Sequence, residues 1–146
     1  PYYCENDTYR KEVEDKGGRV ICFNLHFNPG GSRNNIVNPL NNFLKKNYYD
    51  VVHIHSGSTS VLALCAFVAK WNKVKKIIVQ SHRTGLSKSL KHYVLRMITN
   101  PILSMCPTHY LACSVDAGVW KFPASVVRGK LQIINNGIDL NLFAPE

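Results

Sequence analysis

Three histidines follow or end apolar stretches that are typical of β-strands. His53 and His55 alternate in DVVHIH, and His82 follows KIIVQS. Side chains two residues apart on a strand share a face, so we expect His53 and His55 side by side. His82 precedes Arg83 and Thr84, so its imidazole has a cationic neighbour at a polar turn. Histidine changes charge near neutral pH, and the sequence predicts a polar ligand contact at His82.

An HxH pair at a strand end also holds zinc or iron in some metal-dependent hydrolases, and this alternative stays open for His53 and His55. Such centres need further histidine or carboxylate ligands. The only acidic residue between Val51 and Ile138 is Asp116. We therefore expect no metal ion, and we expect His53 to pack along its strand while His55 faces a crevice or caps the next helix.

Other catalytic patterns are weak. Ser114 and Asp116 form an S-x-D turn that is typical of a helix N-cap, and no GxSxG surrounds Ser114. The glycine-rich stretch Gly30 to Arg33 lacks the Lys-Ser/Thr ending of a P-loop, and GxGxxG does not occur. Neither a serine hydrolase nor a P-loop enzyme is indicated.

The elements that must position these residues alternate between strand and helix. This alternation predicts βαβ units with right-handed crossovers, a Rossmann-like parallel sheet with helices on both faces, and a ligand crevice at the carboxyl ends of the strands. The expected strands are Arg19–Leu25, Val51–His55, Ile77–Gln80, Tyr110–Cys113 and Leu131–Ile134, and the expected helices are Asn6–Asp15, one containing Leu40 and Phe43, Ser60–Trp71, Ser89–Met105 and Val115–Phe122.

Composition fits one globular domain over residues 1–146. Lys and Arg number 18 against 9 Asp and Glu, which suits a phosphate-bearing partner and leaves a basic phosphate- or nucleic-acid-binding module as an alternative.

The helix around Lys88, Lys91, His92 and Arg96 puts its charge on one side, as in a surface helix or one lying on an anionic membrane. Five cysteines without a CxxC pair are typical of reduced, buried thiols in a cytoplasmic protein.

The order YYDVVHIHSG, KKIIVQSHRTG, THYLACSVDAGVWKF and LQIINNGIDLNLF resembles the amino-terminal domain of family-four glycosyltransferases with the GT-B fold. The resemblance is to enzymes of capsular polysaccharide and lipopolysaccharide biosynthesis, and it covers nearly the whole chain. NNGIDLNLF, from Asn135 to Phe143, is its most specific segment.

The resemblance implies retaining transfer of a sugar from a nucleotide-sugar donor to a glycan or lipid-linked acceptor, without a cofactor or metal ion. It implies that His82 is catalytic, entering the cleft near the transferred sugar. Substrate-binding residues by the same resemblance are His55, Ser56, Gly57, Ser81, Arg83, Thr84, Asn136 and Gly137, and Gly137 is expected to have a positive φ.

By this resemblance the chain is a fragment, because the family's first strand and its carboxy-terminal donor-binding domain are missing. We expect the fragment to be inactive alone and to bind no nucleotide-sugar tightly. The strand at Val51 would lack its neighbour, and we expect direct re-pairing, strand exchange with another copy, or chain outside this sequence to fill the gap. The intact enzyme is expected in the cytoplasm, peripheral to the inner face of the membrane, without a nucleic-acid partner.

Overall fold

The computed structural model describes residues 9–26, 33–84 and 90–137. The helix start at Asn6, the stretch Gly30 to Ser32 and the residues Gly85, Lys88 and Asp139 lie outside the described residues. In chain order the elements are α1 (Arg10–Asp15), the 3₁₀-helix η1 (Asn34–Ile36), α2 (Val37–Lys46), β1 (Val51–His55), α3 (Thr59–Trp71), β2 (Lys76–Ser81), α4 (Leu90–Met105), β3 (His109–Ala112), α5 (Val115–Lys121), α6 (Ala124–Gly129) and β4 (Leu131–Ile133).

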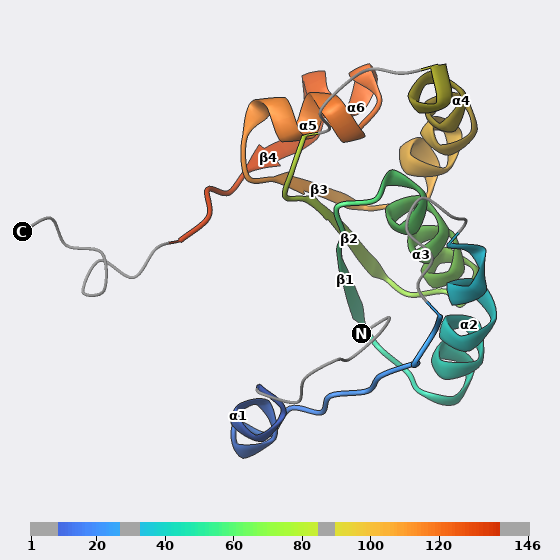
Figure 1. Cartoon of the computed structure of the whole chain (residues 1–146), viewed down its shortest axis with the longest axis vertical. Helices are drawn as coiled ribbons and strands as arrows, with labels where there is room; N and C mark the ends of the chain where they lie inside the picture. Colours follow the sequence, from blue (N-terminus) through green and yellow to red (C-terminus); the bar gives the residue numbers. More distant parts are fainter. Residues whose placement is uncertain (1–8, 27–32, 85–89, 138–146) are drawn as a thin grey trace, which may run out of the picture.

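Four parallel strands form one sheet in the order β1-β2-β3-β4 (Figure 1). This confirms the parallel α/β fold expected from the sequence. Each crossover connection leads from one strand to its immediate neighbour, always in the same direction across the sheet. Right-handed crossovers that all run in one direction place their helices on the same face of the sheet. The arrangement agrees with this rule, because α3 to α6 lie along one side of the sheet and α2 packs beyond α3 (Figure 1).

The core lies between that face and the helices. Ile54, Ile77 and Val79 alternate toward it from β1 and β2, and all three are buried. Tyr110 of β3 is 1% exposed, packs edge-on against Phe122, and donates its hydroxyl to the carbonyl of Leu103 at 2.7 Å. A buried phenol needs such a partner, so this contact ties α4 to the sheet.

The opposite face of the sheet carries His53 and His55, and no helix of the described residues packs on it. The helices expected on both faces are thus found on one face only within this part of the chain. His53, expected to pack along its strand, is exposed. The reason is that its face has no helix layer here to cover it.

The expected strand Arg19–Leu25 is not formed, since residues 18–26 adopt no regular secondary structure. An isolated strand has no partner for its backbone groups. The direct re-pairing expected beside β1 is therefore wrong: β1 pairs with β2 only, and no described strand lies along its outer edge. Strand exchange with another copy, and pairing of β1 with chain outside this sequence, stay predictions. Helix α6, which Pro123 precedes at the N-cap position, was not expected from the sequence.

Helix α3 ends in a Schellman motif with an unusual residue. Val74 N–H donates to the carbonyl of Ala69 at 3.1 Å, and Lys73 N–H donates to that of Lys70 at 3.0 Å. The residue in the left-handed conformation is Lys73, with φ of 60°, where glycine is usual. The Asn72 side chain adds a hydrogen bond of 2.8 Å to the carbonyl of Val68.

Candidate functional site

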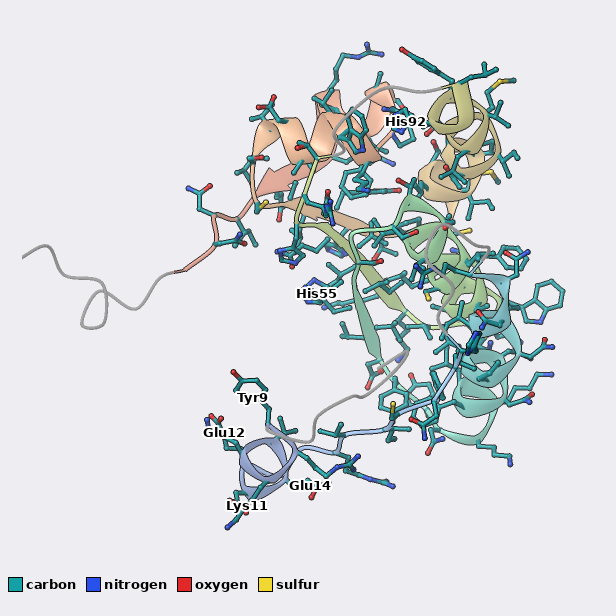
Figure 2. All side chains as sticks on the ribbon, in the orientation of Figure 1. Tyr9, Lys11, Glu12, Glu14, His55 and His92 are labelled. Atoms are coloured by element: carbon teal, nitrogen blue, oxygen red, sulfur yellow. The ribbon has the colours of Figure 1, made fainter. Side chains whose placement is uncertain are left out.

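The carboxyl ends of β1 and β2 bring two predicted site residues together. His55 ends β1 opposite Gln80 in the parallel register, and His82 follows the last residue of β2. His55 Nδ1 lies 2.9 Å from His82 Nε2, and the two rings are nearly parallel, at 19°. Figure 2 shows His55 on the side of β1 away from α3. The sequence predicted a polar ligand contact at His82 but not its hydrogen bond with His55.

The hydrogen bond between the imidazoles limits their charge. One of the two facing nitrogens must accept, so only one of the two rings can be an imidazolium while the bond lasts. His55 is exposed to solvent on one side, yet partial burial of its ring lowers its pKa below the usual value, and the nearby His53 and His82 lower that pKa further. His53 lies beside His55, with ring centroids 4.0 Å apart, which confirms that the two share a face. The arrangement favours a neutral His55.

The metal alternative lacks a suitable arrangement of ligands among the residues that the structure describes. No group of three or more histidine, cysteine and carboxylate side chains in that part of the chain is placed to hold a metal ion. His53 and His55 are both exposed and stand beside a third imidazole rather than a carboxylate.

Lys121, which the sequence analysis did not single out, is buried at this end of the sheet. It is 5% exposed, and its Nζ donates to the carbonyl of Gly57 in the turn after β1. Burial lowers its pKa to about 8, and the positive charge of Arg83 adds to the effect. Little in the sequence indicated a buried amine at Lys121, because a single lysine near the end of a short helix is usually solvated.

Hydrogen bonds with three side chains fix the position of α5, the helix that carries Lys121. The Ser114 hydroxyl accepts from the Ala117 N–H at 3.2 Å, which confirms the expected N-cap. The Ser81 hydroxyl donates to the Ala117 carbonyl at 2.8 Å, joining α5 to the end of β2. Arg96 of α4 donates to carbonyls at the last turn of α5, at 3.0 Å to Val119, 3.2 Å to Trp120 and 2.8 Å to Phe122.

The two described basic side chains of α4, His92 and Arg96, face the protein rather than solvent. His92 lies against Trp120 with ring centroids 4.3 Å apart, and Arg96 is engaged with α5. The labelled His92 in Figure 2 lies between α4 and the α5–α6 layer. The apolar side is exposed instead, which reverses the ordinary surface helix considered above. Its exposed residues are Leu90, Tyr93, Val94, Met97 and Ile98.

The remaining predicted residues differ in accessibility. Ser56 Oγ accepts from the Ser58 N–H at 3.0 Å, so it shapes the turn after β1. Ser81 is fully buried, with its hydroxyl on α5. Arg83 lies against Gly57: a Cβ at position 57 would stand 3.1 Å from the Arg83 Cδ. Gly57 therefore permits a close approach that a larger residue would hinder.

The other predicted positions are exposed. Thr84 follows Arg83 at the surface, and Asn136 and Gly137 lie beyond β4. The expected positive φ of Gly137 is wrong, because its backbone lies outside the left-handed region and a side chain there would meet open space. The chain needs no left-handed turn at this residue. Nothing in the geometry tests the roles assigned to these positions, which stay predictions.

Comparison with curated proteins finds one named relative. Over 146 aligned residues the chain is 30% identical to "Putative glycosyltransferase EpsF" of Bacillus subtilis (strain 168). The match covers 94% of this chain and 36% of the relative, so the chain spans about a third of that protein's length. No protein-family model and no solved structure matches the chain.

Within the described residues, no helix is both long and apolar enough to cross a bilayer.

Proposed function

We propose that this chain is the acceptor-side domain of a glycosyltransferase. The observation that carries the proposal is the similarity to the Bacillus subtilis protein, which covers nearly all of this chain. The parallel α/β sheet supports it, since such sheets bind ligands at the carboxyl ends of their strands. The hydrogen-bonded His55 and His82 lie at those ends.

The reaction proposed is transfer of a sugar from a nucleotide-sugar donor to a glycan or lipid-linked acceptor, with retention of configuration. His82 would contact the transferred sugar. His55 holds one nitrogen of His82, which leaves the other nitrogen to bond a hydroxyl group. A neutral His55 suits this role, because a neutral ring can donate to or accept from its partner according to tautomer.

The intact protein is proposed to act at the inner face of a membrane, in the biosynthesis of capsular polysaccharide or lipopolysaccharide. Support comes from α4, whose exposed face carries Leu90, Tyr93 and Met97 at 80%, 54% and 77% exposure. A helix with an exposed apolar face can lie in the interface of a membrane. This placement would bring a lipid-linked acceptor close to the domain.

The test replaces His82 with Ala in the intact protein and measures sugar transfer from a panel of nucleotide-sugars to a membrane extract. Turnover is expected to fall by about 10²-fold or more, in the range for loss of a positioned acid-base group. His109→Ala is the matched control, because His109 is exposed at the start of β3, at the other end of the sheet. Unchanged turnover in His82→Ala would remove His82 from the mechanism, and no transfer by the intact protein with any donor would reject the proposed function.

A further inference from the structure

The buried Lys121 has unused hydrogen-bonding capacity. An ammonium group has three N–H donors, and in the described residues its Nζ has one acceptor, the Gly57 carbonyl. Only 5% of the residue is exposed, so bulk water does little to solvate the charge. Burying a charge is costly unless it is paired and hydrogen-bonded. The single hydrogen bond of Lys121 therefore offsets only part of the free-energy cost of burying its charge.

The charged group that acts on Lys121 in the described residues is another cation, Arg83. Arg83 reaches toward Gly57 from the turn after β2, and its charge contributes to the low pKa of Lys121. Among the residues that the structure describes, the ion pairs join Arg10 to Glu14, Lys16 to Glu12 and Lys75 to Asp50. None of these involves Lys121 or Arg83.

A purely structural role for Lys121 does not account for this arrangement. A hydrogen bond to the Gly57 carbonyl would tie α5 to the turn after β1 equally well from a neutral donor. Two like charges around the same glycine repel, and an anion between them would remove that cost. Both cations lie where a parallel sheet binds its ligands.

We propose that Lys121 and Arg83 form a subsite for a phosphate group of the ligand bound at the carboxyl ends of β1 and β2. A tetrahedral phosphate offers oxygens in several directions, which suits the compact lysine charge and the planar arginine fork together. The inference deepens the proposed function and rests on it for the source of the phosphate, which is either the donor diphosphate or a phosphorylated acceptor.

The experiment measures anion binding by the intact protein with isothermal titration calorimetry. The probes are inorganic pyrophosphate, uridine diphosphate and glucose 1-phosphate, with acetate as an anion of a different shape. The variants are Lys121→Gln and Arg83→Gln, and Lys70→Gln, at the exposed end of α3, is the matched control. Arg83 is exposed, so its variant tests the subsite even where Lys121→Gln fails to fold.

Pyrophosphate is expected to bind about tenfold more weakly to each subsite variant than to the wild type, the usual effect of losing a charged hydrogen bond. Lys70→Gln is expected to bind as the wild type does, and acetate to bind to none. Dependence of uridine diphosphate binding on Lys121 assigns the phosphate to the donor, and dependence of glucose 1-phosphate binding assigns it to the acceptor. If no phosphate probe binds, or if both subsite variants bind pyrophosphate as tightly as the wild type does, the inference is overturned.

A second readout follows the Lys121 side chain directly. Bound phosphate favours the charged amine, so adding pyrophosphate should raise the pKa of Lys121, followed by NMR of its Cε resonance. An unchanged pKa at saturating pyrophosphate would count against direct contact. Neither measurement requires catalysis: phosphate binding without sugar transfer would reject the proposed function alone, and sugar transfer without phosphate binding would reject the subsite alone.

Discussion

The buried amine of Lys121 predicts an unusual dependence of stability on pH. Its pKa is about 8 in the folded protein against 10.5 for a free lysine. Between these values the unfolded chain binds more protons than the folded one, so stability rises as pH rises through this window and is independent of this group below it. The gain across the whole window is about 3 kcal/mol, because each pH unit between the two pKa values contributes about 1.4 kcal/mol.

The measurement is urea unfolding between pH 7 and 10 for the wild type and Lys121→Met. Relative to the variant, the wild type should become more stable across the upper part of this range. Lys70→Met is the matched control, since its lysine is exposed at the end of α3. The difference in the free energy of unfolding between the wild type and Lys121→Met should change with pH. A difference that stays constant would contradict the burial of the amine.

At the residue scale the sequence predicted the histidines better than the lysine. The two-residue period of a strand was enough to place His53 beside His55, and strand-end reasoning placed His82 near them. Lys121 depends on a contact with Gly57, far away in the sequence. Nothing in the local pattern of α5 shows that the turn after β1 folds over its amine, so this part of the site could not be predicted.

At the element scale, Arg96 links α4 to the last turn of α5. Its guanidinium donates to the carbonyls of Val119, Trp120 and Phe122. Arg96→Met should lower the free energy of unfolding by about 1–3 kcal/mol, because these helix-end carbonyls lose a charged donor. Chemical denaturation measures this, with Arg128→Met on the exposed surface of α6 as the control. Equal stability of the two variants would show that Arg96 does not hold α5.

Close packing of α5 against β4 depends on Gly118. A Cβ at this position would stand 2.3 Å from Leu131 Cδ2, so Leu131 would have to move within the core. Gly118→Ala should reduce the free energy of unfolding by about 1–2 kcal/mol through overpacking. Gly129→Ala is the matched control in α6, where the added methyl meets nothing within 4 Å. It should raise stability by about 0.5–1 kcal/mol, and a result in which both variants behave alike would refute the packing argument.

The spacing of apolar residues predicted most strands and helices between residues 51 and 133. The reason is that these segments bury one face against the core. The apolar spacing failed at Arg19–Leu25, where a run of apolar residues finds no neighbouring strand to pair with. It also failed for α4. The pattern identified an amphipathic helix, yet which side faced the protein depended on Trp120 and the carbonyls of α5, which lie beyond the helix itself.

At the scale of the whole molecule, the outer edge of β1 predicts self-association. Its backbone groups are unpaired within the described residues, and Val51 is 45% exposed on this strand. Open edges recruit other strands unless charge or proline blocks them. Sedimentation velocity of the 146-residue chain should show dimers that increase with concentration and decrease in Val51→Lys. Val115→Lys, on α5, is the control, and a monomer at all concentrations would contradict the expectation.

The left-handed Lys73 at the end of α3 shows where this protein could be made more robust. A lysine at φ of 60° is strained in a way that glycine is not. Lys73→Gly should raise the melting temperature, by an amount equivalent to about 0.5–1 kcal/mol, whereas Lys70→Gly, inside the helix, should lower it. A lower melting temperature for Lys73→Gly would refute this. Because Lys73 precedes β2, at the end of the sheet away from His55 and Lys121, stability here can be adjusted independently of ligand binding.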